Sequence, residues 1–323
     1  MSQRPFKILS IDGGGIKGLY SASILAGIEK ENGSIAENFD MICGTSTGGI
    51  IALGLAIGMT ALEIANFYET KGPLIFPYNN FLTKTLATGK QFTIRSKYSD
   101  NELKKSLTEV FGTKRMRDIN SPVILVPAIN LTNGDNIVFK TPHQPEFTRD
   151  PEHLLVDVAL ATSAAPTYFP IARMETFEGA QLIDGGIWAN NPALLGIIEA
   201  LTFYVGPNKE YKRFKLLSVG NVRNNIGWSI RKQRRQSIRH CALKLIETTM
   251  DTQSQAVHNY IAHLIKSLDG DYLRIECTGL SAEHAKHIAL DKAHPNAISI
   301  LKHLAKSESD KWCSKPEIKI FFN

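Results

Sequence analysis

Ser46 stands in the segment Gly44-Thr45-Ser46-Thr47-Gly48, a G-x-S-x-G pattern between an apolar run and a helical segment. Glycines on both sides of a serine allow the sharp strand-to-helix turn that exposes a nucleophilic serine oxygen. The dipole and the free N–H groups of the following helix would also favour negative charge there. The segment therefore predicts a serine nucleophile, and its alternative is an ordinary glycine-rich turn.

A second segment, DGGGIKG at residues 12–18, directly follows the first apolar run of the chain. Consecutive glycines let backbone N–H groups converge on an anion without obstruction by side chains. The anion could be a phosphate or a reaction oxyanion, and a tight turn between strand and helix explains the segment equally well. Because the segment lacks a P-loop ending and the spacing of a dinucleotide fingerprint, we do not expect a nucleotide phosphate here.

A third segment, Asp184-Gly185-Gly186, comes after an apolar approach at residues 181–183. An aspartate before two glycines is usually a turn residue. Beside a nucleophilic serine, however, a carboxylate can act as the general base that accepts the hydroxyl proton. Together, the three segments could perform acyl transfer through a serine.

The three segments, in this order, resemble the patatin-like phospholipase family, whose pattern is a DGGGxRG oxyanion loop, a G-x-S-x-G serine and an Asp-Gly-Gly or Asp-Gly-Ala aspartate. The stretches Ser163–Phe169 and Asn190–Pro192 are also similar to that family, so the resemblance spans about residues 7–192. Lys17 stands where the family usually has Arg. Because Lys cannot form a bidentate fork, a planar anchoring role at this position would be weakened.

Carried over by position, the resemblance makes Ser46 the nucleophile, Asp184 its general base, and the amides of Gly13, Gly14 and Gly15 the oxyanion hole. The other motif residues would support this geometry: Asp12, Lys17, Gly18, Gly44, Gly48 and Gly185. The implied reaction is hydrolysis of carboxylic esters in membrane phospholipids or other acyl-lipids, through an acyl-serine intermediate. The resemblance implies neither a metal nor an organic cofactor.

Two other interpretations stay open. In a Ser-Asp-His triad the chain order is serine, acid, histidine, and seven histidines follow Asp184: His240, His258, His263, His284, His287, His294 and His303. None of them lies in a glycine-flanked loop after a clear strand, and the stretch 282–290 has a helical pattern. The other interpretation is a storage or scaffold protein with incidental esterase activity, which the intact motifs disfavour.

A basic stretch in the last third of the chain contains Arg231, Lys232, Arg234, Arg235, Arg239 and His240. It could contact anionic lipid or hold the phosphates of a regulatory nucleotide, and the alternative is a solvated helix face. The resemblance includes bacterial enzymes that cyclic oligonucleotides switch on in antiviral defence, so a cyclic nucleotide is a candidate activator. No recognition motif predicts binding to a nucleic acid polymer.

The composition is that of a globular protein, since 43% of the 323 residues are hydrophobic and 21% are charged, with a net charge of +6. The four cysteines are far apart and form no zinc pattern, which favours a reducing compartment. The N-terminus lacks the pattern of a secretory signal, and the longest apolar stretch, 50–59, is too short to span a bilayer. We therefore expect a cytoplasmic protein that is peripheral to the membrane when active.

Apolar runs alternate with helical segments, which predicts an α/β, patatin-like layered fold with a mainly parallel central sheet flanked by helices. We expect strands at 6–12, 39–46, 122–129, 136–139, 214–219 and 271–277, helices at 18–31, 60–72, 103–111 and 152–162, a further helix through Gly48, and a hairpin at 170–183. Thr60 with Glu63, and Ser99 with Glu102, have capping-box spacing. The irregular segment 74–98 is a candidate lid. Residues 1–222 would form the catalytic core, and 223–323 a helical region packed on it.

Overall fold

The computed structural model describes residues 4–77, 96–223 and 238–322. Its strands are β1 Phe6–Ile11, β2 Met41–Gly44, β3 Val123–Asn130, β4 Asp135–Lys140, β5 Ala172–Met174, β6 Ala180–Asp184, β7 Phe214–Val222 and β8 Gly270–Cys277. Its α-helices are α1 Gly18–Asn32, α2 Ile35–Asn38, α3 Thr47–Ala56, α4 Ala61–Ile75, α6 Asn101–Phe111, α7 Leu155–Ser163, α8 Gly186–Ala189, α9 Ala193–Phe203, α10 Ile238–Leu264, α11 Ala282–Ala285, α12 Pro295–Trp312 and α13 Pro316–Lys319.

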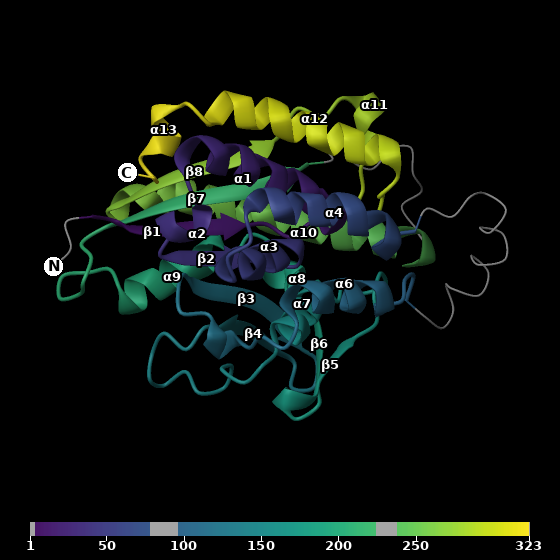
Figure 1. Ribbon diagram of the computed structural model, residues 1–323, viewed down its shortest axis with the longest axis horizontal. Coiled ribbons are helices and arrows are strands. Elements are labelled where there is room, and N and C mark those ends of the chain that lie inside the picture. The colour runs from purple at the N-terminus through teal and green to yellow at the C-terminus, as the bar shows by residue number, and fades with distance from the viewer. Residues whose placement is uncertain (1–3, 78–95, 224–237, 323) are drawn as a thin grey trace.

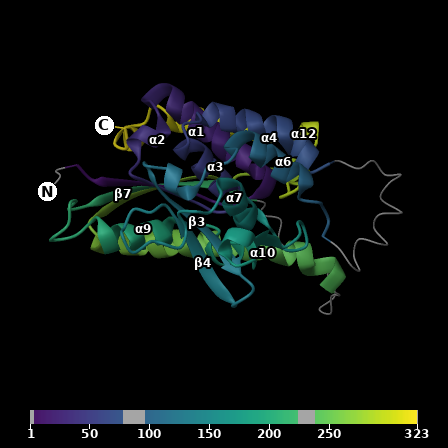
Figure 2. The ribbon, with the colours of Figure 1, turned by 60° about the horizontal axis from the view of Figure 1, so that its bottom comes forward.

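The strands form one sheet between two layers of helices (Figure 1, Figure 2). Their order is β5-β6-β3-β2-β1-β7-β8, and β4 pairs with β3 outside this path. The neighbours β8, β7, β1, β2 and β3 run parallel, whereas β4 and β6 both run antiparallel to β3. The sheet is therefore mainly parallel, as predicted.

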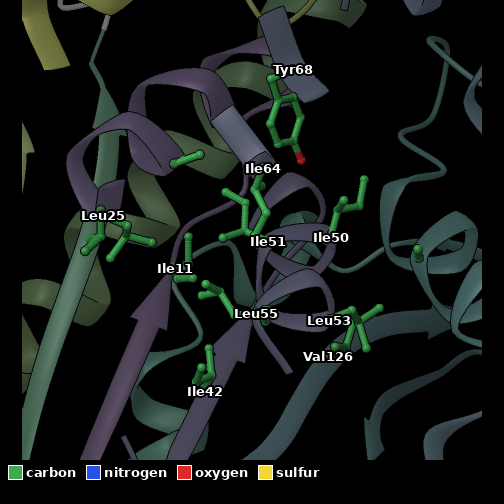
Figure 3. Packing of buried hydrophobic residues seen from close by; sticks show 14 of the residues in the cluster. Ile11, Leu25, Ile42, Ile50, Ile51, Leu53, Leu55, Ile64, Tyr68 and Val126 are labelled. Atoms are coloured by element: carbon green, nitrogen blue, oxygen red, sulfur yellow. The ribbon is translucent and has the colours of Figure 1, made fainter. Parts of the chain in front are cut away.

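Helices cover both faces of the sheet. Helices α1, α4 and α12 pack on one side, and α9 and α10 cover the other (Figure 2). Strand β1 shows why both faces are buried, because its residues alternate between two apolar clusters. Ile11 packs with Ile42 of β2 and Leu55 of α3 in the first cluster (Figure 3), and Phe6 and Ile8 belong to the second cluster.

Most of the predicted strands and helices are present within a few residues of their expected ends. The capping box of α4 is confirmed, since the Thr60 hydroxyl accepts a hydrogen bond from the Glu63 N–H and the Glu63 carboxylate accepts one from the Thr60 N–H. The hairpin is confirmed as well, because β5 pairs antiparallel with β6 and leads to Asp184.

Three local predictions were wrong. The second capping box is absent, because Asp100 rather than Ser99 precedes α6 and makes no side-chain cap. Helix α4 continues past Pro73 to Ile75, so the helix does not end at the Gly72-Pro73 pair. The helical pattern at 282–290 yields only the four-residue α11. The candidate lid lies largely in residues 78–95, outside the described residues.

The region after residue 223 joins the same sheet as the rest of the chain. Strand β8 pairs in parallel with β7, and α12 packs along α1 and against β8. Within the described residues, no helix combines the length and the apolar character needed to cross a bilayer. The division at residue 222 stays a prediction.

Candidate active site

The turn at Ser46 is strained, with φ 54° and ψ −123° between β2 and α3. This backbone region is costly for any residue with a side chain and occurs mainly at functional sites. The flanking glycines allow the turn, because a Cβ on Gly44 would collide with the Gly48 carbonyl, and one on Gly48 with the Ile11 carbonyl. The predicted strand-turn-helix context of Ser46 is confirmed.

Thr162, near the end of α7, holds the backbone of this turn. Its hydroxyl accepts a hydrogen bond from the Ser46 N–H at 2.9 Å and donates one to the Pro127 carbonyl at 2.7 Å. The Ser46 N–H is therefore occupied and is not a donor to a substrate. The sequence gives no signal for Thr162, because its role depends on how α7 packs beside β3.

Asp184 ends the antiparallel strand β6 at the same edge of the sheet at which β2 ends before Ser46. Cys43 of β2 pairs with Leu125 of β3, and Ala128, three residues further along β3, pairs with Asp184. Since Ser46 lies three residues beyond Cys43, the antiparallel β6 ends beside the serine turn. Both side chains line one cavity.

The Asp184 carboxyl is buried, with only part of its hydrogen-bonding capacity used. Oδ1 accepts a hydrogen bond from the Gly186 N–H at 2.7 Å, while Oδ2 accepts none from the described residues. Burial raises the pKa of Asp184 to about 7, although the Gly186 N–H and the nearby Ser46 hydroxyl both stabilise its charged form. A carboxylate with this pKa is suited to general-base chemistry near neutral pH.

The glycine segment does not offer all three predicted N–H groups equally. The Gly13 N–H donates to the Asn190 carbonyl at 3.0 Å, and the Ile16 N–H donates to the Leu290 carbonyl at 2.8 Å. The N–H groups of Gly14 and Gly15 have no acceptor among the described residues. Of the three, these two remain available to an oxyanion.

The side chain of Asn221, near the end of β7, packs against the glycine segment. A bulge between Val219 and Val222 interrupts the β7 ladder, and bulges redirect side chains. The Asn221 amide donates to the Gly13 carbonyl, and a Cβ on Gly14 would strike this same side chain. Asn221 is a second supporting residue that the sequence analysis missed.

The cavity at Ser46 and Asp184 contains about 600 Å³ of space not filled by atoms, part of which is open to solvent. Its lining is mainly apolar and includes Ile50, Ile75, Phe76, Leu103 and Phe169. Pockets with apolar walls and few polar groups typically bind apolar ligands. An acyl chain fits this character.

A family model for patatin-like phospholipases matches residues 9–197. This chain belongs to the patatin-like phospholipase family. A cGAMP-activated phospholipase of Pseudomonas aeruginosa is 36% identical over 299 residues, covering 92% of this chain and 86% of that relative. A cGAMP-activated phospholipase of Escherichia coli is 30% identical over 334 residues, covering 98% and 92%. Patatin-like protein 2 of Arabidopsis thaliana is 30% identical over 335 residues, covering 86% and 77%.

Membership confirms two predictions made from the sequence, the patatin-like fold and the class of lipid ester hydrolase. The remaining motif residues of this patatin-like phospholipase make supporting contacts through a hydrogen bond, close packing or an ion pair. The Lys17 ammonium group donates to the Val222 carbonyl at 3.3 Å, Gly18 lies against the Thr47 side chain, and Gly185 lies against the Pro127 carbonyl. Asp12 forms an ion pair with Arg274 of β8.

None of the histidines whose side chains are described lines the cavity of this patatin-like phospholipase. Six of the seven downstream histidines have described side chains, and the cavity lining contains none of them: His258, His263, His284, His287, His294 and His303. Their described contacts are elsewhere, as when His258 faces the Tyr272 hydroxyl at 2.9 Å.

No group of three or more His, Cys, Asp or Glu side chains in the described parts of the chain could hold a metal ion.

Helix α10, from the C-terminal region, contributes contacts that the sequence analysis did not predict. Met250 lines the cavity, Gln253 accepts a hydrogen bond from the Asn191 N–H at 2.9 Å, and Ser254 accepts one from the Asn190 amide at 2.9 Å. Asn190 and Asn191 follow the Asp-Gly-Gly segment. Helix α10 therefore supports the segment that follows Asp184.

Proposed function

We propose that this patatin-like phospholipase hydrolyses carboxylic esters of membrane phospholipids with Ser46 as nucleophile and Asp184 as its only general base. The observation that carries the proposal is the pairing in one apolar cavity of a serine on a strained turn with a buried carboxyl whose pKa is about 7. The absence of a described histidine from the cavity lining supports a dyad over a triad.

In the first step Asp184 takes the proton of the Ser46 hydroxyl as its oxygen attacks the ester carbonyl. The Gly14 and Gly15 N–H groups stabilise the oxyanion of the tetrahedral intermediate. As the intermediate collapses, Asp184 returns the proton to the leaving alcohol, and the acyl group stays on Ser46. A water molecule that Asp184 deprotonates then releases the fatty acid and restores the serine.

We further propose that a cyclic nucleotide activates the enzyme. Two relatives that align with more than nine tenths of this chain are named cGAMP-activated phospholipases. The basic stretch at 231–240, which lies largely outside the described residues, is the candidate contact for an anionic membrane surface or for the nucleotide phosphates. On this proposal the protein is peripheral to the membrane while it is active.

The experiment is to incubate purified protein with a total lipid extract, with and without cGAMP, and to identify released species by mass spectrometry. We expect free fatty acids and lysophospholipids that increase with cGAMP and are absent with Ser46→Ala. Release that cGAMP does not change would contradict activation by this nucleotide. Turnover at background with every lipid would favour a storage or scaffold protein.

A further inference from the structure

The carboxylate of Asp12, directly before the glycine segment, is bound by a guanidinium from the other end of the chain. Arg274 donates from Nη1 to Oδ1 at 3.2 Å and from Nη2 to Oδ2 at 2.7 Å. The two side chains are only 5% and 3% exposed. Two parallel hydrogen bonds between a guanidinium and a carboxylate fix direction as well as distance.

The orientation of Arg274 is itself fixed by its neighbours on the sheet. Arg274 of β8 pairs with Ser218 of β7, and its Nη1 donates to the Ser218 hydroxyl at 2.7 Å. Its Nε and Nη2 donate to Glu276 at 3.0 and 2.8 Å. Glu276 also pairs with Arg223 at 3.4 Å, so the cluster contains two carboxylates and two guanidinium groups. The cluster is balanced in charge.

Helix α10 contacts the same carboxylate from another side. Burial raises the pKa of Asp12, whereas Arg274 and the Ser254 hydroxyl favour its charged form. Ser254 also accepts a hydrogen bond from the Asn190 amide, and the Asn190 carbonyl accepts the one from the Gly13 N–H. The Asp12 carboxylate is therefore bound from β8, while the neighbouring Gly13 N–H is linked to α10 through Asn190.

A glycine segment does not fix its own backbone conformation, because glycine has no side chain to pack and samples many backbone conformations. Only Gly13 separates Asp12 from Gly14. The position of Asp12 therefore contributes to where the Gly14 and Gly15 N–H groups point, together with the contacts of Asn190 and Asn221 to Gly13.

We propose that Arg274 is a positioning residue for the reaction, because it holds Asp12 so that the Gly14 and Gly15 N–H groups converge on the oxyanion formed at Ser46. This inference rests on the proposed function and adds to it a requirement for the C-terminal region. Arg274 touches no reacting atom. Its effect should fall on the transition state, where the oxyanion exists, and not on substrate binding.

The test uses two variants of the pair in the full-length chain. Arg274→Lys keeps the charge and loses the fork. The double variant Asp12→Asn/Arg274→Gln leaves no unpaired ion of this pair, and an unpaired buried ion is what destabilises a protein most. The matched control is Asp271→Asn/Arg213→Gln. This double variant removes an exposed ion pair between Arg213, the residue before β7, and Asp271 of β8.

The measurements are kcat and KM for a soluble short-chain ester, normalised to sites labelled by a fluorophosphonate, and the inhibition constant of a trifluoromethyl ketone. A ketone of this kind forms an oxyanion when the serine adds to it. For both Arg274 variants we expect kcat to fall on the order of a hundredfold, with KM changed by less than about threefold. The inhibition constant should rise with the fall in kcat, and the control should match the wild type.

Hydrogen exchange of the peptide containing residues 12–16 is measured on the same samples and does not depend on activity. We expect faster exchange in both Arg274 variants than in the control. Wild-type kcat in a folded variant, or exchange equal to the control, would overturn the inference. If Arg274→Lys does not fold, the double variant decides. A wild type that stays inactive with cGAMP present would instead contradict the proposed function, and hydrogen exchange would still decide the role of Arg274.

Discussion

The two parts of the chain on either side of residue 222 contribute to the candidate site in different ways. The N-terminal part supplies Ser46, Asp184 and the glycine segment, which act through backbone conformations written into short local motifs. The C-terminal part supplies single side chains such as Ser254 and Arg274, which reach the site from a helix and a strand with no motif of their own. On the proposed mechanism the N-terminal part carries the reacting groups, and the C-terminal part adds to the support that Thr162 and Asn221 already give them.

This difference teaches that a motif search finds the chemistry but not what positions it. The fork of Arg274 is fixed by pairing between β7 and β8 across more than 50 residues of sequence. The N-terminal part should therefore dominate the size of catalytic effects, and the C-terminal part should tune them.

The largest effects should come from the dyad. Ser46→Ala removes the nucleophile and Asp184→Asn removes the base, so each should lower kcat for a soluble ester by at least about 10⁴-fold. Because the two groups act as a unit, the double variant should be little worse than either single one. Steady-state kinetics on folded protein checks this.

The matched comparison for the dyad uses the described downstream histidines. Replacing His258 or His294 by Ala should leave kcat within about threefold of the wild-type value. Only a group that contacts the reacting atoms can lower kcat as much as the loss of Ser46 or Asp184 does. A single folded histidine variant with no turnover would restore the triad.

The next effect should come from the glycine segment. In Gly14→Ala the new Cβ would strike the Asn221 side chain and displace the oxyanion donors. Loss of one such donor typically costs on the order of a hundredfold in kcat. Gly279→Ala is the control, because a Cβ there meets nothing within 4 Å. Equal kcat in the two variants would count against the role of the segment.

A smaller and more selective effect should come from the basic stretch. Neutralising Arg231, Arg234, Arg235 and Arg239 should lower hydrolysis of anionic vesicles by about tenfold and spare a soluble ester, because exposed cations attract anionic lipid. Added salt should cause the same selective loss, since screening acts over about 8 Å at physiological ionic strength. An equal loss on both substrates would indicate damage to the fold or to a regulatory site.

The smallest effect should be on stability. Because the pKa of Asp184 is raised to about 7 in the folded protein and is near 4 in an unfolded chain, the folded state binds more protons between these values. Stability due to this group is therefore lost as pH rises toward 7. Asp184→Asn should melt higher than wild type by a few °C at pH 8 and show little change at pH 4. Thermal unfolding at the two pH values checks the sign.

The parts of the fold that depend on local pattern could be predicted from the sequence. The strand before Asp12, the turn at Ser46 and the hairpin before Asp184 each carry their own apolar run and turn residues. The ends of helices were harder to predict, because α4 continues past Pro73 to Ile75 and α6 begins after Asp100, which makes no side-chain cap.

The rest of the site could not be predicted, because it comes from contacts between distant segments. The family resemblance implied an oxyanion hole made of the Gly13, Gly14 and Gly15 N–H groups, but the Asn190 carbonyl accepts a hydrogen bond from the Gly13 N–H. Thr162 and Asn221 support the site only because α7 packs beside β3 and a bulge interrupts β7. No spacing along the chain encodes these neighbours.

The most direct test of the central claim is the rate at which a fluorophosphonate labels Ser46 as a function of pH, in wild type and in Asp184→Asn. A dyad predicts that the wild-type rate rises about tenfold per pH unit below about 7 and then levels off, as Asp184 loses its proton. It also predicts that Asp184→Asn is slower by at least about a thousandfold and shows no such midpoint. If Asp184→Asn keeps a midpoint near 6.5, the ordinary pKa of histidine, a histidine is the base and the dyad is wrong.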